Sequence, residues 1–121
     1  MENTRKTLGE RGEALAVRYL RKKGYKILER NYRCRWGEID LVASDKGSLV
    51  FIEIKTRAST DFGQPQEAVG FSKQKKLILS AKAYMVERHV DEETNARFDV
   101  VAVHLGQSDP WIDVIKDAFQ L

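Results

Sequence analysis

The sequence predicts a mixed α/β fold in which helices flank a central sheet of about five strands. Helical periodicity runs through residues 7–24 and 72–89, whereas residues 25–35, 97–105 and 111–119 have the composition of strands. A further pair of strands forms an apparent hairpin within residues 36–57. The resulting order is helix, three strands, helix, two strands (αβββαββ), which is typical of a sheet covered by helices.

Composition indicates one soluble globular domain spanning residues 1–121. Apolar residues make up 42% of the chain and charged residues 32%. No apolar run approaches the roughly 20 residues of a membrane helix, and the polar start, MENTRKTLGER, lacks the apolar core of a signal peptide. We therefore expect a cytoplasmic protein without membrane partners. Cys34 is the sole cysteine, which excludes an internal disulfide and a cysteine zinc cluster and favours a packing role.

The first helix carries start and stop signals. Thr7 and Glu10 have the spacing of a capping box, and Lys22, Lys23 and Gly24 form a helix stop. One apolar stripe should pack on the sheet: Leu8, Gly12, Leu15, Tyr19 and Leu20. The next segment, residues 25–35, alternates as a strand and predicts two faces. One carries Lys26, Leu28, Arg30 and Tyr32, and the other carries Ile27, Glu29, Asn31 and Arg33.

The hairpin WGEIDLVASDKGSLVFIEIKTR contains charged residues on strands that otherwise appear to be core. If Lys46 and Gly47 form its two-residue turn, Asp40 lies opposite Glu53, and Glu38 lies opposite Lys55. The opposite face then carries Ile39, Leu41, Ile52 and Ile54. Facing residues have Cβ atoms about 4.5–5.5 Å apart, so opposed carboxylates would destabilise the sheet.

The opposed carboxylates predict a nearby cation, and two candidates remain open. Lys55 lies two residues from Glu53 on the same face. A divalent metal is the alternative, because Mg²⁺ prefers oxygen ligands and is commonly held by one or two carboxylates with water and phosphate. Rigid strands suit such a site.

The remaining segments complete the fold. Residues 58–71 are punctuated by Gly, Pro and Ser and should be mostly loop. The second helix buries a stripe formed by Leu77, Ile78, Ala81, Tyr84 and Met85. RFDVVAVHL is nearly continuous in apolar character, which predicts a central strand covered on both faces.

Charge is distributed unevenly along the chain. Residues 1–35 contain eleven Lys or Arg and four Glu, a net charge of +7, whereas the whole chain carries +3 and the remainder therefore −4. A basic N-terminal third indicates a polyanionic partner, although a solvated helix face explains the same pattern.

Specific motifs resemble a known family. The arrangement of Asp40, Glu53 and Lys55 resembles the PD-(D/E)xK nuclease superfamily, with Ile39 where a proline often precedes the aspartate. A broader set resembles the bacterial YraN-like family over nearly the whole chain: GERGEALAVRYL, GYKILERNYR, GEIDLVASD, LVFIEIKTR, FGQPQEAV and RFDVVAV. That family is similar to Holliday-junction resolvases.

The resemblance implies a restriction-endonuclease-like core and a nuclease site. Asp40 and Glu53 would hold Mg²⁺ or Mn²⁺ and activate water, with the backbone carbonyl of Ile54 as a further ligand. Glu13 would join the site from the first helix. Lys55 would act as a base or stabilise the transition state electrostatically, and both roles stay open.

Other polar residues rank lower. Candidates for substrate contact are Thr56, Arg57, Gln64, Glu67 and Lys73. Lys73 also opens the second helix against its dipole, which hints at an anion-binding edge. Tyr32 and Trp36 suit base stacking, although core packing is the simpler interpretation. His89 and His104 form no motif and are interpreted as structural or surface residues.

Three functional classes follow. The leading hypothesis is a metal-dependent nuclease that acts on DNA, in preference to RNA, at branched or junction structures. The alternative is a nucleic-acid-binding or accessory module that keeps the fold without cutting. A dinucleotide enzyme is disfavoured because no strand precedes GERG and no G-x-G-x-x-G is present. Related resolvases often act as dimers, but no residue here indicates a dimer interface.

Overall fold

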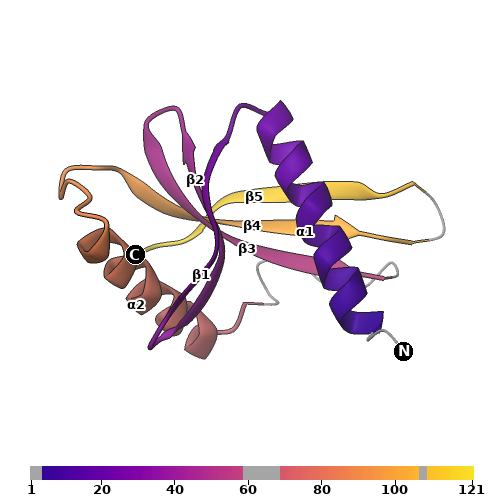
Figure 1. Cartoon of the computed structure of the whole chain (residues 1–121), viewed down its shortest axis with the longest axis horizontal. Coiled ribbons are helices and arrows are strands. Elements are labelled where there is room, and N and C mark those ends of the chain that lie inside the picture. Colours follow the sequence, from indigo (N-terminus) through magenta and orange to yellow (C-terminus); the bar gives the residue numbers. More distant parts are fainter. Residues whose placement is uncertain (1–3, 59–68, 107–108) are drawn as a thin grey trace.

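The computed structural model describes residues 4–58, 69–106 and 109–121 and confirms the predicted order of elements. They are α1 (Thr4–Lys22), β1 (Lys26–Cys34), β2 (Gly37–Asp45), β3 (Ser48–Arg57), α2 (Phe71–Glu87), β4 (Ala96–His104) and β5 (Trp111–Phe119). The strands form one sheet in the order β1-β2-β3-β4-β5, in which only the β3–β4 pair is parallel. The two helices pack on opposite faces of this sheet (Figure 1).

The β2–β3 hairpin has the predicted turn and register. Lys46 and Gly47 have positive φ values of 52° and 87°, as a two-residue hairpin turn requires, and Asp45 faces Ser48. The paired ladder runs from this turn to Leu41 opposite Ile52 and stops there. It ends one position before the predicted Asp40–Glu53 pair, so β2 leaves β3 where the carboxylates begin.

The separation of the strands follows from the twist of the sheet. In Figure 1, β1 and β2 cross β3, β4 and β5 steeply, and their far ends diverge. Beyond the split, β2 pairs with β1 alone, where Glu38 faces Arg33 with a side-chain ion pair of 3.5 Å. The predicted pairing of Glu38 with Lys55 is therefore wrong, because the two strands have separated before reaching it.

The simple alternation predicted for β1 is also wrong. The register between β1 and β2 shifts between Ile27 and Glu29, which leaves Leu28 49% exposed. Asn31 has a positive φ of 55°. Alternation in the sequence cannot predict a bulge. Tyr32 is therefore buried, whereas the other residues that the alternation assigns to its face are exposed.

Two apolar cores lie on the two faces of the sheet. Beneath α1, Ala16, Val17 and Leu20 pack with Leu41 and Ile52. Beneath α2, a second core contains Leu77, Ala81 and Tyr84 of the helix with Val42, Phe51 and Phe98 of the strands. Ile39 belongs to this second core, so its predicted position beside Leu41 and Ile52 is wrong. The middle of β4 is buried on both faces, as predicted.

Helix α1 begins earlier than predicted. Its first residue is Thr4, which places Thr7 one turn inside the helix, so the predicted capping box does not mark the helix start. Gly12 is buried against β3, and a Cβ atom built there would collide with the Thr56 side chain. This contact fixes the N-terminal half of α1 close to the end of β3. None of the described helices is both long enough and apolar enough to cross a membrane.

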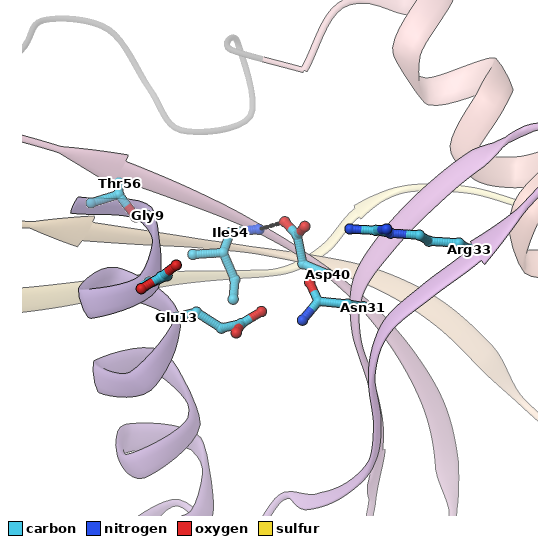
Figure 2. A pocket seen from close by; sticks show the side chains of 8 residues that line it. Gly9, Glu13, Asn31, Arg33, Asp40, Ile54 and Thr56 are labelled. Carbon is cyan, nitrogen blue, oxygen red and sulfur yellow. Dashed lines mark hydrogen bonds between the residues drawn. The ribbon is translucent and has the colours of Figure 1, made fainter. Parts of the chain in front are cut away.

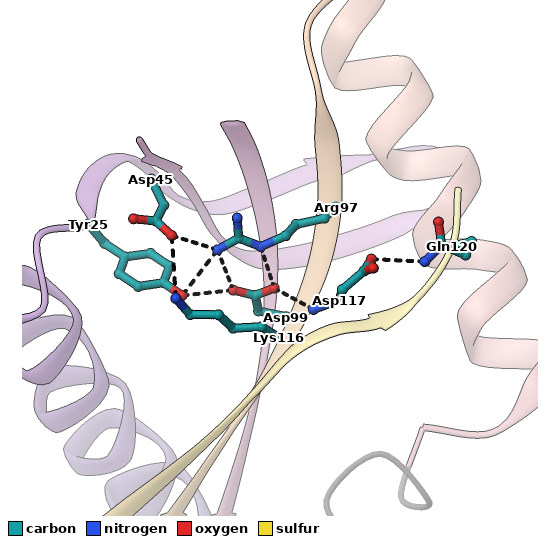
Figure 3. A network of polar contacts seen from close by, with 7 residues as sticks. All are labelled: Tyr25, Asp45, Arg97, Asp99, Lys116, Asp117 and Gln120. Carbon is teal, nitrogen blue, oxygen red and sulfur yellow. Dashed lines mark hydrogen bonds and ion pairs between the residues drawn. The ribbon is translucent and has the colours of Figure 1, made fainter. Parts of the chain in front are cut away.

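A buried polar network holds the end of β5 (Figure 3). Asp99 is fully buried and accepts hydrogen bonds from the Tyr25 hydroxyl (2.9 Å), Arg97 Nε (2.9 Å) and the Asp117 amide (3.0 Å). Asp117 has a φ of 53° and lies where the β4–β5 register shifts. Burial, and then the hydrogen bond to Asp99, raise the pKa of Tyr25 to about 12. Asp99 therefore anchors the irregular end of an edge strand.

Candidate active site

The carboxylate of Asp40 occupies the gap that opens between β2 and β3. The backbone amide of Ile54 donates a hydrogen bond to Asp40 Oδ2 at 2.8 Å, which replaces a missing rung of the ladder (Figure 2). The N–H and C=O groups of one strand residue point to the same side of the strand. The Ile54 carbonyl therefore faces the same gap as the Asp40 carboxylate.

Asp40 and Glu53 interact strongly although they are not a ladder pair. Burial raises the pKa of Asp40, and the negative charge of Glu53 raises it further, to about 7. The hydrogen bond from Ile54 opposes this rise. The side chain of Glu53 is only 7% exposed, so the repulsion is poorly screened by water. The predicted ladder pairing of Asp40 with Glu53 is wrong, because the β2–β3 pairing ends at Leu41 and Ile52, but the predicted repulsion between the two carboxylates is found.

The cation that neutralises Glu53 comes from α2. Lys73 Nζ lies 3.1 Å from Glu53 Oε1. Burial alone would lower the pKa of Lys73, but the charge of Glu53 and their hydrogen bond raise it overall. Lys55 lies nearby, and burial followed by the positive charge of Lys73 lowers its pKa. Lys73 was expected only as a substrate contact, because sequence cannot place the first turn of α2 beside β3.

A cavity of about 370 Å³ opens beside the gap. Glu13 extends into it from α1, and Asn31, Asp40, Ile54 and Thr56 also line it (Figure 2). Glu13 forms a 3.1 Å ion pair with Arg30 of β1. The structure thus brings Glu13, Asp40 and Thr56 around one cavity, while Glu53, Lys55 and Lys73 gather at the α2 side of β3.

The donor groups fit a magnesium ion. The described residues contain no group of three or more His, Cys, Asp or Glu side chains suited to a metal. Two carboxylates, Asp40 and Glu53, and the Ile54 carbonyl nevertheless approach one gap, where burial and the charge of Glu53 raise the pKa of Asp40. Mg²⁺ commonly takes one or two carboxylates and fills its other positions with water and phosphate. Glu13 lines the same cavity as Asp40 and pairs with Arg30, but it does not form a three-carboxylate cluster with Asp40 and Glu53.

The remaining predicted residues are placed as follows. Arg57 ends β3, close enough to Lys55 for its charge to lower the pKa of that ammonium. Gln64 and Glu67 lie outside the described residues. Tyr32 is buried in the α2 core, so it does not offer a stacking face, whereas Trp36 is 39% exposed beneath the Arg35 guanidinium.

Asn31 and Arg33 of β1 also line the cavity, and sequence reasoning missed them. The polar character of the end of β1, next to the strand that carries Asp40, could have indicated that these residues line the site. The bulge in β1 obscured this indication, because it changes which residues share a face of the strand.

Comparisons with known proteins place the chain in a family. Residues 12–103 match the family described as "Uncharacterised protein family UPF0102". The chain belongs to this family. The match confirms the YraN-like resemblance read from the motifs, and the matched residues include Glu13, Asp40, Glu53, Lys55 and Lys73.

Relatives of this UPF0102 chain cover its length. A UPF0102 protein of Syntrophus aciditrophicus is 49% identical over 93% of the chain and 88% of the relative. One of Clostridium botulinum is 44% identical over the whole of both chains. Among solved structures, Pyrococcus furiosus SfsA in complex with Ca²⁺ is 12% identical with a TM-score of 0.37, and the match covers 92% of this chain and 62% of that longer chain.

Proposed function

We propose that this UPF0102 protein is a metal-dependent nuclease that hydrolyses phosphodiester bonds in DNA. The observation that carries the proposal is the mutual repulsion of two carboxylates, half-buried Asp40 and buried Glu53, at the split of the sheet. A pair of this kind destabilises the fold unless a cation joins it. Mg²⁺ or Mn²⁺ is the cation that suits both the oxygen donors and a phosphate substrate.

Each residue has a distinct task in this reaction. Asp40, Glu53 and the Ile54 carbonyl would hold the ion, which supplies positive charge for the phosphate oxygens and makes an attacking water more acidic. The ammonium of Lys55 has a lowered pKa, which suits a group that either takes a proton from that water or stabilises the developing charge. Lys73 pairs with Glu53 at 3.1 Å and would keep that carboxylate in position for the ion.

Electrostatics support nucleic acid as the substrate class. A second cavity of about 480 Å³ runs along α1 and β1 and is lined by Arg18, Arg21, Lys22 and Arg30. Arg30 also pairs with Glu13, which lines the site cavity, so the two cavities adjoin. Cationic side chains along a groove attract a phosphate backbone. DNA with branched or junction structure is the form that the family resemblance favours.

A second candidate function is nucleic-acid binding without cutting, as an accessory module. The Lys73–Glu53 ion pair favours it, because a resident ammonium neutralises one carboxylate without any metal. Binding of nucleic acid to the cationic side chains that line the second cavity would then be the whole function.

A cleavage assay distinguishes the two candidates. Purified protein is incubated with labelled duplex, flap and four-way-junction DNA, with Mg²⁺, with Mn²⁺ or with chelator. The nuclease proposal expects metal-dependent products that disappear in Glu53→Gln and fall by about 100-fold or more in Lys55→Met, in line with the loss of a transition-state donor. Tight, salt-sensitive binding without products supports the accessory module instead.

The matched control is Glu92→Gln. Glu92 is exposed, lines neither of the two cavities described above and is not among the groups that shift the pKa of Asp40. Its removal should leave cleavage unchanged. Products that persist in Glu53→Gln would identify a contaminating nuclease and overturn the assignment.

A further inference from the structure

His104 and Trp111 form a planar aromatic pair at the end of the sheet. Their rings are stacked with centroids 3.7 Å apart and an interplanar angle of 7°. They face each other across the antiparallel β4–β5 pair, at the last position of β4 and the first of β5. Trp111 is 50% exposed, which is unusual for a residue with so large an apolar surface.

The pair lies on the sheet face that carries Glu53 and Lys55. In the parallel β3–β4 register, Lys55 faces Ala102 and Arg57 faces His104, without any shift. Alternate residues of a strand share a face. His104 and Trp111 therefore continue the row begun by Arg57, on the face of Glu53 and Lys55.

Among the described residues, His104 is the only ring that stacks on the indole, and Trp111 remains 50% exposed. The sheet order ends with β5, so His104 covers one side of Trp111 and the other side lies beyond the sheet edge. Within the described residues, His104 Nδ1 is buried without a hydrogen-bond partner. Stacking on Trp111 therefore holds the imidazole although Nδ1 is buried without a partner among those residues, a cost that ordinary packing positions rarely carry.

We propose that Trp111, backed by His104, is a stacking site for an unpaired nucleobase of the substrate strand. The inference rests on the proposed function, since it takes the ligand to be nucleic acid. With about 3.3 Å per strand residue and 4.8 Å between strands, Trp111 lies roughly 16 Å from Glu53. That span equals about five base steps of duplex rise, and fewer in an extended single strand.

This placement specifies the substrate class. A base in an intact duplex is stacked on both sides and cannot cover the indole, whereas a base in a single-stranded flank or an open branch can. The cations of Lys55 and Lys73 lie on the β3 side of the row. The strand would run from the carboxylates, past these cations, to the indole. Duplex DNA with a short single-stranded overhang is therefore the preferred form.

Binding to oligonucleotides without divalent metal tests the stacking site. The probes are a short thymine oligonucleotide and an abasic oligonucleotide of equal length and charge. Wild-type protein should prefer the thymine form. Stacking of one base is worth about 1–3 kcal/mol, so Trp111→Ala should weaken thymine binding by about 5- to 150-fold. Abasic binding should stay the same.

Trp36→Ala is the matched control, because Trp36 is the other tryptophan and is 39% exposed, but the Arg35 guanidinium lies over its ring, 4.6 Å from the centroid, and occupies a stacking face. It should keep the thymine preference. A second measurement avoids the risk that Trp111→Ala misfolds: in Trp36→Phe, Trp111 is the sole tryptophan, and the thymine oligonucleotide should quench its emission while the abasic one should not.

The outcomes separate this inference from the proposed function. Equal binding of thymine and abasic oligonucleotides by wild-type protein overturns the stacking site. Unchanged thymine affinity in folded Trp111→Ala does so too, even if metal-dependent cleavage is observed. A thymine preference that depends on Trp111, in a protein that cuts no DNA under any metal condition, supports the stacking site and overturns the nuclease.

Discussion

Replacement of Asp40 by asparagine should stabilise the protein at neutral and alkaline pH. Asparagine keeps an oxygen that can accept the 2.8 Å hydrogen bond from the Ile54 amide. Its amide group also donates toward Glu53, whereas the ionised Asp40 repels that carboxylate. Asp40→Asn thus removes the electrostatic cost of the pair while preserving the strand geometry.

The size of the effect follows from the pKa of Asp40. Its rise from 3.8 in the unfolded chain to about 7 in the folded protein corresponds to roughly 4 kcal/mol at most. The folded state holds the proton more tightly, so stability from this group is fully present below about pH 4. This contribution to the free energy of unfolding is lost as the pH rises from about 4 to about 7, and above that pH the free energy of unfolding no longer changes because of Asp40. We expect a gain of about 2 kcal/mol for Asp40→Asn at pH 8, since the asparagine has its own desolvation cost.

Thermal unfolding at several pH values measures this gain. For a chain of this size, about 2 kcal/mol corresponds to a rise in Tm of roughly 6–10 °C. The difference between Asp40→Asn and wild type should shrink toward zero near pH 4. Glu92→Gln is the control, because Glu92 is exposed and is not among the groups that shift the pKa of Asp40, and it should change Tm little at any pH. A variant that is no more stable than wild type at pH 8, or a gain independent of pH, would refute the reasoning.

Three further substitutions test other parts of the structure. Lys73→Ala leaves Glu53 without its 3.1 Å partner, so it should lower the free energy of unfolding by about 1 kcal/mol in the presence of chelator. The rise in Tm on adding Mg²⁺ should then be larger in Lys73→Ala than in wild type. An equal rise in both proteins would argue against a metal beside Glu53. Gly12→Ala forces a Cβ into Thr56 and should lower the free energy of unfolding by about 1–3 kcal/mol, an amount typical of overpacking. Combining it with Thr56→Ala should restore much of the loss in a thermal unfolding measurement. Asp99→Ala leaves a buried network without its acceptor and should cost about 3–5 kcal/mol in urea unfolding; a loss below 1 kcal/mol would contradict its anchoring role.

The fold was largely predictable because its signals are local. The turn at Lys46 and Gly47 fixes the β2–β3 register from two residues, and the apolar run of β4 indicates a strand covered on both faces. The start of α1 was wrong by about one turn, because Thr7 and Glu10 fit a capping box inside a helix as well as at its start.

The candidate site was predictable only in its strand residues. Asp40 and Glu53 could be brought together from the register alone, but the twist that separates β2 from β3 depends on the whole sheet. The contact between Lys73 and Glu53 depends on how the crossover helix packs, and no periodicity encodes it. His104 shows the same limit, since its partner Trp111 is defined only once β5 pairs with β4.

The hydrogen bond from the Ile54 amide to the Asp40 carboxylate gives residue 40 a structural role in addition to its proposed chemical role. An acceptor there closes a gap in the backbone pairing whether or not any reaction takes place. A relative that had abandoned its chemistry would therefore still gain from keeping Asp or Asn at this point. Position 53, whose carboxylate bonds no backbone amide among the described contacts, is the more telling marker of a working centre.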